Sequence, residues 1–172
     1  MSLTPLYTTA QIRRRVEELA MALDERFGKH STPHLIGVLK GGFVFLADLM
    51  RAMSRPTTVD FVRVESYNSA TTSSGTPQLI ESPSMNLRNR DVVIVEDIVD
   101  TGLTLETVRQ HLLTKQPRSL STVALLDKQV RRQIDVPLDL VGFRVGDEFI
   151  VGYGLDINEM HRELSYLTVV AR

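Results

Sequence analysis

The feature that most constrains the fold is an apolar run that ends in acids. Residues 92–95 read Val-Val-Ile-Val, and Glu96 and Asp97 follow directly. Four β-branched apolar residues in succession predict a strand without a polar face, which must be covered on both sides, as in a parallel sheet. We therefore expect the two acids at the carboxyl end of a buried strand, where open α/β sheets bind ligands.

A short loop with a third acid follows. Its members are Asp100, Thr101, Gly102, Leu103 and Thr104. A helical pattern then covers residues 105–113. Hydroxyls, backbone N–H groups and the positive end of a helix suit a phosphate monoester. Vicinal acids beside such a cradle suit a ribose 5-phosphate, because its 2′ and 3′ hydroxyls can each donate to a carboxylate.

Two other interpretations apply to parts of this segment. A hydrophobic strand ending in two acids is also the Walker B pattern, but the chain has no Gly-x-x-x-x-Gly-Lys-Ser/Thr loop. Asp100 alone could be a turn or N-cap aspartate without a chemical role. As a whole the segment resembles the phosphoribosyl pyrophosphate signature of the type I phosphoribosyltransferases. With the features below, the chain is similar to the hypoxanthine (hypoxanthine-guanine) members over nearly its full length.

Composition sets the broad class. The 172 residues suffice for one substantial core, and a net charge of −1 with interspersed signs disfavours nucleic acid or anionic membranes as partners. The absence of cysteine excludes disulfides and cysteine chemistry. Residues 1–10 lack the plan of a signal peptide, and no apolar stretch approaches 18 residues. We expect a single cytoplasmic domain over residues 1–172.

Helical and strand patterns alternate along the chain. An apolar stripe from Ile12 to Leu23 predicts a helix capped by Thr8 or Thr9 and ended by Gly28, and further helical patterns lie around 43–53 and 105–113. The strand candidates are Leu35–Leu39, Val59–Val64, Val92–Val95, Ser121–Leu126, Leu140–Phe143 and Phe149–Val151. This alternation predicts an α/β fold with a mostly parallel central sheet flanked by helices. The resemblance implies that the strand-rich end builds a small hood over the carboxyl edge.

The loop Lys40-Gly41-Gly42 lies between a predicted strand and a predicted helix. Glycines allow a backbone to approach a ligand closely, and a helix N-terminus favours an anion. Two glycines that merely turn the chain are the alternative. The resemblance implies that this loop binds pyrophosphate and that the Leu39–Lys40 peptide bond is, or can become, cis.

Residues 66–75 are polar and short in side chain, which is typical of a mobile surface loop. The resemblance makes Ser66 and Tyr67 the start of a closing lid. Arg63 precedes this lid, and Glu65 departs from the family pattern because some relatives carry a basic residue there.

A lysine at a strand end, such as Lys128, is ordinarily solvated surface. The resemblance implies that it binds the exocyclic oxygen of a purine. An ammonium group only donates, so it suits a 6-oxo acceptor and mismatches the 6-amino group of adenine. The sequence leaves any role of Arg131 and Arg132 in anion binding open.

Residues 149–156 can be interpreted as a core strand and turn without any function. Gly152 and Gly154 do not form a dinucleotide-binding fingerprint, because its third glycine is missing. The resemblance implies that the purine stacks on Phe149 and that the Ile150 backbone reads its edge. It makes Asp156 a magnesium ligand, since Mg²⁺ prefers carboxylate, water and phosphate oxygens.

The resemblance adds Glu96 and Asp97 as further metal ligands. It assigns Arg162 to pyrophosphate, whose oxygens fit the planar guanidinium fork. We assign His161 no role. The remaining histidines have no zinc-ligand spacing and are interpreted as structural: His30, His34 and His111.

The resemblance thus implies an enzyme that moves 5-phosphoribosyl from phosphoribosyl pyrophosphate to N9 of a 6-oxopurine, with Mg²⁺, as a homodimer or homotetramer. Asp100 would exchange a proton with purine N7. Adenine-specific relatives typically lack the loop aspartate, so Asp100 with Lys128 disfavours that alternative, whereas xanthine stays open. An RNA-binding regulator of the pyrimidine attenuation type shares the fold, but such a protein needs a basic face for RNA, and the balanced charge of this chain argues against it.

Overall fold

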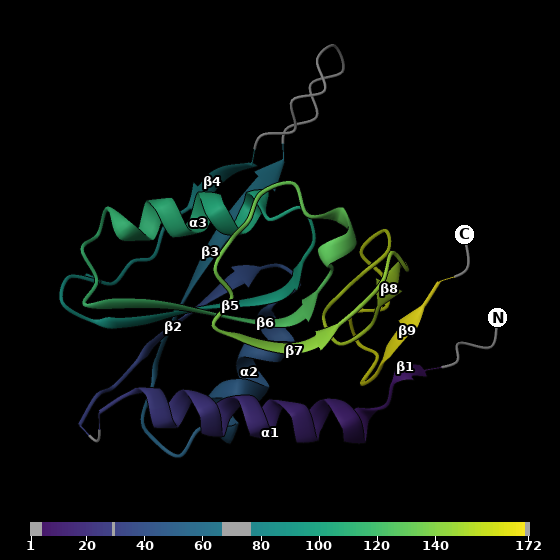
Figure 1. Ribbon diagram of the computed structural model, residues 1–172, viewed down its shortest axis with the longest axis horizontal. Coiled ribbons are helices and arrows are strands. Elements are labelled where there is room, and N and C mark those ends of the chain that lie inside the picture. The colour runs from purple at the N-terminus through teal and green to yellow at the C-terminus, as the bar shows by residue number, and fades with distance from the viewer. Residues whose placement is uncertain (1–4, 29, 67–76, 171–172) are drawn as a thin grey trace, which may run out of the picture.

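A six-stranded sheet forms the centre of the computed structural model, which describes residues 5–28, 30–66 and 77–170, apart from the side chain of Ser66 (Figure 1). In spatial order its strands are β4 (Pro77–Glu81), β3 (Thr58–Ser66), β2 (His34–Leu39), β5 (Asp91–Val99), β6 (Ser119–Asp127) and β7 (Leu140–Arg144). All neighbours are parallel except β3 and β4. The predicted mostly parallel sheet is confirmed.

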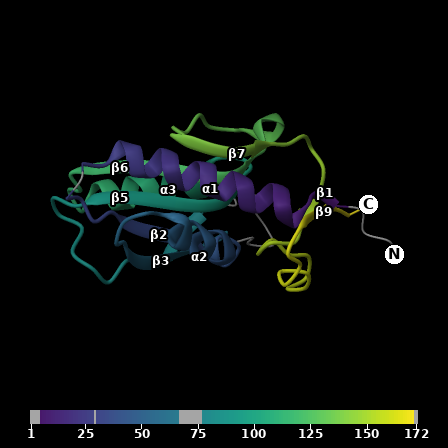
Figure 2. The ribbon, with the colours of Figure 1, turned by 90° about the horizontal axis from the view of Figure 1, so that it is seen from below.

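Helices cover both faces of this sheet. Helices α1 (Thr9–Arg26) and α2 (Phe43–Ala52) pack on one face, and α3 (Leu103–Leu113) packs on the other (Figures 1 and 2). Alternate residues of β5 enter the two cores: Val93 and Val95 pack with α1 and α2, whereas Val92 and Ile94 pack with α3. The apolar run has no polar face because both of its sides are buried.

The predicted elements form, with some changes in length. Thr8 caps α1 in a capping box with Gln11, and α1 ends just before Gly28. Strand β5 is longer than predicted, because its pairing with β6 continues to Val99. Glu96 and Asp97 therefore lie inside the last part of the strand rather than beyond it. The edge strand β4 was not predicted, since its alternating pattern is short and mostly exposed.

A small antiparallel sheet forms the hood that the resemblance implied. Its order is β1 (Pro5–Tyr7), β9 (Leu167–Val169) and β8 (Ile150–Val151), and it lies beyond the carboxyl ends of β5 and β6 (Figure 1). Tyr7 of the hood stacks on Phe143 of β7, with ring centroids 4.0 Å apart. This contact ties the hood to the edge of the main sheet.

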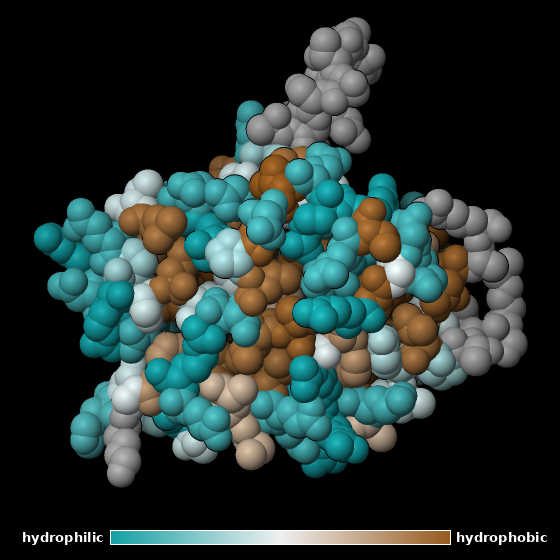
Figure 3. All heavy atoms as spheres, in the orientation of Figure 1, coloured by the Kyte–Doolittle hydropathy of each residue, from teal (hydrophilic) through white to brown (hydrophobic). Residues whose placement is uncertain are grey.

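Hydrophilic residues cover most of the face shown in Figure 3, and hydrophobic ones gather near its centre, over β6 and β7. Within the described residues, no helix has the length and apolarity needed to cross a membrane.

Candidate active site

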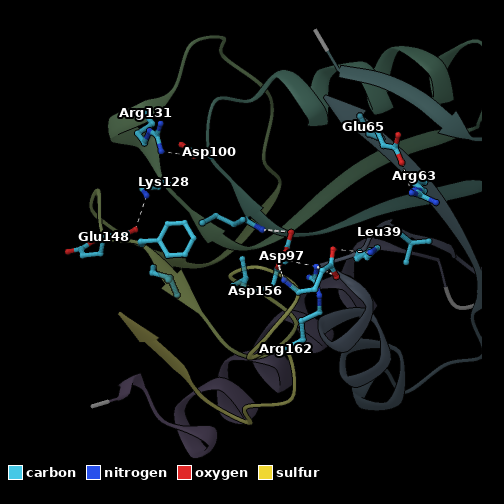
Figure 4. Close-up of a pocket in the computed structure, with 18 residues that line it drawn as sticks. Leu39, Arg63, Glu65, Asp97, Asp100, Lys128, Arg131, Glu148, Asp156 and Arg162 are labelled. Carbon is cyan, nitrogen blue, oxygen red and sulfur yellow. Dashed lines mark hydrogen bonds and ion pairs between the residues drawn. The ribbon is translucent and has the colours of Figure 1, made fainter. Parts of the chain in front are cut away.

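A cavity of about 520 Å³ opens between the carboxyl edge of the sheet and the hood (Figure 4). A smaller hollow of about 70 Å³ adjoins it at the start of α3, and Ile98 and Asp100 line both. Together they are lined by every predicted site residue except Gly42, Leu103, Ser66 and Tyr67. Tyr67 and the side chain of Ser66 lie outside the described residues. The chain folds so that segments distant in sequence meet at one edge of the sheet.

Two adjacent acids of β5 form the floor of these hollows. Glu96 is 5% exposed and Asp97 is 8% exposed. Burial raises the pKa of Glu96, and the neighbouring charge of Asp97 raises it further. Among the described residues, the Glu96 Oε2 atom has no hydrogen-bond partner. A buried oxygen without a partner is costly, so the pair is suited to a ligand that brings hydroxyl groups.

The loop from Asp100 to Thr104 is shaped for an anion. Gly102 is the N-cap of α3 at φ 88°, and a Cβ atom there would lie 2.8 Å from the Ile134 carbonyl oxygen. The N–H group of Leu103 donates to Thr101 Oγ1 at 3.3 Å, and the N-terminus of α3 adjoins the small hollow. The interpretation of Asp100 as an N-cap is wrong, because Gly102 holds that position.

The Asp100 carboxylate lies at the junction of the two hollows. Its Oδ1 atom is buried without a hydrogen-bond partner among the described residues. Its Oδ2 atom lies 3.4 Å from Arg131 Nη1, and Arg131 Nε lies 3.8 Å from Asp147. Asp100 is therefore held on one side by an arginine, and its other oxygen is buried without a partner among the described residues.

The loop at residues 40–42 meets the buried acids. The Leu39–Lys40 peptide bond is cis, as predicted. A Cβ atom on Gly41 would lie 1.6 Å from Asp97 Oδ2, so glycine is required for the acid to pack against this loop. Gly42 is the N-cap of α2, without a side-chain cap. The second helix N-terminus thus also opens near the cavity.

Lys128 is a buried residue of the cavity wall, only 4% exposed, rather than a surface lysine. Its Nζ donates to the Glu148 carbonyl oxygen at 2.8 Å and lies 3.6 Å from Asp147. Phe149, which is 37% exposed, and the backbone of buried Ile150 line the same cavity. A fixed cationic donor beside an accessible aromatic face suits a planar ligand with an oxygen acceptor.

Charged residues of the loop between β8 and β9 line the cavity away from Lys128 (Figure 4). Arg162 Nη2 lies 2.8 Å from Asp156 Oδ1, and Arg162 Nη1 donates to the Gly154 carbonyl oxygen at 2.7 Å. Glu159 lies 3.0 Å from Lys40 Nζ and 3.2 Å from Arg162 Nη2. Within the described residues, no three His, Cys, Asp or Glu side chains gather as a ready metal site.

A family model described as a phosphoribosyl transferase domain matches residues 2–158. The chain belongs to the phosphoribosyl transferase family. Within it, the chain is similar to a hypoxanthine-guanine phosphoribosyltransferase of Aquifex aeolicus, with 43% identity covering 92% of this chain and 89% of the relative. It is 42% identical to a hypoxanthine phosphoribosyltransferase of Salmonella typhimurium, with the same two coverages.

Solved structures agree with this membership. A crystal structure of a hypoxanthine-guanine phosphoribosyltransferase from Bacillus anthracis, with a HEPES molecule in its active site, matches with a TM-score of 0.92. It is 37% identical and covers 99% of this chain and 100% of its own. This phosphoribosyltransferase therefore has the type I fold that its sequence predicted.

Two arginines whose roles the sequence left open have partners within the protein. Arg132 is a structural residue, because it pairs with buried Asp127 and donates to the carbonyl of Asp100 at 3.1 Å. Arg63 pairs with Glu65. Sequence reasoning missed Glu159 and Asp147, and the one available signal was the acid at 159, three residues after Asp156 and three before Arg162.

Proposed function

We propose that this chain is a purine-salvage enzyme that transfers 5-phosphoribosyl from phosphoribosyl pyrophosphate to N9 of hypoxanthine or guanine, giving IMP or GMP and pyrophosphate. The observation that carries the proposal is the order of groups along the cavity (Figure 4). In Figure 4, Lys128 and Glu148 lie at one side of the cavity, and Asp97, Asp156 and Arg162 lie close together near its centre. This order fits a base, a ribose and a pyrophosphate.

The base end supports a 6-oxopurine. Lys128 offers a buried ammonium group, which would donate to the exocyclic oxygen while the ring stacks on Phe149. The carbonyl and N–H groups of Ile150 would read the edge of the base. Adenine would place an amino group opposite this donor and forgo a charged hydrogen bond, which contributes about 1.5–3 kcal/mol.

The middle of the cavity supports the sugar phosphate. Glu96 and Asp97 would hold the ribose hydroxyls, and the loop of residues 101–104 would bind the 5-phosphate at the N-terminus of α3. Fixing the phosphate also fixes the direction from which N9 attacks the ribose. Asp100, whose Oδ1 atom has no hydrogen-bond partner among the described residues, would take the proton that the purine loses at N7.

The remaining part supports pyrophosphate and a divalent cation. Arg162 and Lys40 would bind phosphate oxygens, as would the backbone of Gly41 and Gly42. Mg²⁺ is commonly held by one or two carboxylates with water and substrate phosphates, so Asp156, with Glu96 and Asp97, fits it without a closed protein cage. When bound, Mg²⁺ would neutralise the leaving pyrophosphate. Ser66 and Tyr67 are proposed to close over the site.

A spectrophotometric assay tests this proposal. The purified chain, phosphoribosyl pyrophosphate and Mg²⁺ are combined in turn with hypoxanthine, guanine, xanthine and adenine. We expect nucleotide formation with hypoxanthine or guanine, and none when the metal is removed by a chelator. No turnover with any 6-oxopurine, together with a salt-dependent shift of RNA in a gel, would favour the RNA-binding alternative instead.

Three broader features belong to the same proposal. A single domain over residues 1–172 is supported by β1 and β9, which pair although they lie at opposite ends of the chain. A homodimer or homotetramer is supported by exposed apolar side chains on α2 and β3: Phe43, Met50 and Phe61. Sedimentation would test the assembly, and cell fractionation would test the predicted cytoplasmic location.

A further inference from the structure

Glu159 connects the two cations that the proposed function assigns to pyrophosphate. Its Oε1 atom lies 3.0 Å from Lys40 Nζ, and its Oε2 atom lies 3.2 Å from Arg162 Nη2. Each carboxylate oxygen thus contacts a different cation, one from the β2–α2 loop and one from the hood. A phosphate group would bring negative oxygens to the same two cations.

The backbone aims this side chain at the site. Ile157 and Met160 exchange two backbone hydrogen bonds, at 3.1 Å and 3.0 Å, so Asn158 and Glu159 form the centre of a two-residue turn. Both have positive φ, 52° and 64°. The N–H group of Glu159 also donates to Asp156 Oδ2 at 2.8 Å. The turn is therefore fixed to the same acid that pairs with Arg162.

Glutamate is a poor choice for this turn on conformational grounds alone. Two-residue turns with positive φ at both centres favour Asn followed by Gly. The chain has Asn158 at the first position, as expected, but Glu159 at the second, where glycine would be less strained. The side chain is 64% exposed and packs against no core. What the residue contributes is its charge toward Lys40 and Arg162.

We propose that Glu159 is an internal competitor of pyrophosphate, occupying Lys40 and Arg162 when the subsite is empty and displaced when pyrophosphate binds. The hydrogen bond from Lys40, and to a smaller extent the one from Arg162, lowers the pKa of the Glu159 carboxyl below its usual range, so this carboxyl is charged at neutral pH. The competition weakens the equilibrium binding of pyrophosphate. The inference rests on the proposed function for the identity of the anion.

Titration calorimetry with pyrophosphate, with and without Mg²⁺, tests the inference. Exposed ion pairs are individually weak, so Glu159→Gln should tighten pyrophosphate binding by about three- to tenfold. The gain should appear with and without the metal, because it comes from the two protein cations. The matched control is Glu163→Gln, which removes the same charge from an exposed neighbour that forms no ion pair within the described residues.

A second variant separates competition from a structural role. Glu159→Gly relaxes the turn, so it should unfold at the same or a higher temperature while binding pyrophosphate more tightly than the wild-type chain. Unchanged or weaker binding in both Glu159 variants would overturn the inference, as would an equal gain in Glu163→Gln or a gain confined to samples with Mg²⁺. If the wild-type chain synthesises the nucleotide but the affinity for pyrophosphate does not change when residue 159 is substituted, only this inference fails and the proposed function stands.

Discussion

Strand β5 carries buried acids at both ends, and their surroundings differ. At the amino end, Asp91 accepts hydrogen bonds from Arg118, Ser31 and Ser119. Arg118 lowers the pKa of Asp91 far below its usual range. At the carboxyl end, Glu96 has an oxygen without a partner among the described residues, and burial raises its pKa. The first acid is satisfied by the protein, whereas the second keeps a free oxygen for the ribose hydroxyl that we propose.

Cavity size alone would not have separated these two ends. The hollow beside Asp91 holds about 640 Å³, slightly more than the about 520 Å³ beside Asp97. What differs is that Glu96 and Asp100 each keep one buried oxygen without a partner among the described residues, whereas both oxygens of Asp91 accept hydrogen bonds. In a ligand site, some buried donors and acceptors have no partner within the protein, whereas in a structural cluster they are already hydrogen-bonded. The predictions below test this difference, beginning with the largest effect.

Asp100→Asn should lower kcat by about 10²–10⁴-fold, because asparagine keeps the size of the side chain but cannot accept the purine proton. Binding of the nucleotide product should change by less than about threefold, since no contact is lost. Steady-state kinetics and calorimetry give the two numbers. Turnover close to the wild-type rate would remove Asp100 from the chemistry and leave its unpartnered oxygen unexplained.

Lys128→Ala should lower kcat/KM for hypoxanthine and guanine by about 10- to 150-fold, which corresponds to losing about 1.5–3 kcal/mol from a charged hydrogen bond. Adenine should remain a poor substrate, because the rest of the base pocket is unchanged. Lys115→Ala is the matched control, since that lysine is exposed at the end of α3. If the two substitutions had equal effects, Lys128 would contribute only its positive charge and would not recognise the purine base.

The carboxyl end of β5 was largely predictable from sequence, whereas the amino end was not. The apolar run, the acids and the loop that follows are contiguous, so their chemistry could be interpreted in one segment. The partners of Asp91 come from residues 31, 118 and 119, which only the fold brings together. The hydrogen-bond partner of Lys128, the Glu148 carbonyl, likewise lies on a segment that only the fold brings near.

Glu159 shows a second limit of sequence reasoning. Its position between Asp156 and Arg162 was visible, but its contact with Lys40 joins residues 119 positions apart. The unpredicted β4 has a different cause, because it is a short edge strand whose exposed residues carry little periodic signal. Local patterns thus specify elements and motifs, whereas ion pairs across the site require the tertiary structure.

Asp91→Asn should lower the free energy of unfolding by about 2 kcal/mol at pH 7, because a charged, buried hydrogen-bond acceptor is replaced by a neutral one. The folded pKa of Asp91 is lowered, so its contribution is present above pH about 4 and is lost as the pH falls further. The difference between the two proteins in urea unfolding should therefore shrink progressively as the pH falls below about 4. Kinetic constants at 25 °C should not change.

The control for this experiment is Asp135→Asn, which alters an exposed acid. A loss of activity in Asp91→Asn without a loss of stability would contradict the comparison, because the amino end of β5 would then take part in binding or catalysis.

His34 offers the smallest expected effect. It is the buried first residue of β2, opposite Val92 near the amino end of β5, and one of its ring nitrogens has no partner among the described residues. Its Nδ1 contacts Thr58 Oγ1 at 2.7 Å, but Nε2 has no partner among the described residues. Burial lowers the pKa of His34, with Arg90 acting in the same direction and Asp60 against it. We attribute the free nitrogen to a neutral ring, whose lone pair costs less to bury than a carboxylate oxygen.

A neutral ring makes stability depend on pH in a known direction. Because the folded pKa is lowered, the contribution of His34 is complete above about pH 6.5 and declines as the pH falls below it, by at most about 1.4 kcal/mol per pH unit. His34→Asn can keep the contact with Thr58 and does not titrate, so this part of the slope should disappear from urea unfolding curves between pH 7.5 and 5.5. An unchanged slope would show that the ring does not protonate on unfolding. If phosphate instead stabilised the wild-type chain but not the variant, Nε2 would be a ligand group, and the contrast between the two ends of β5 would fail.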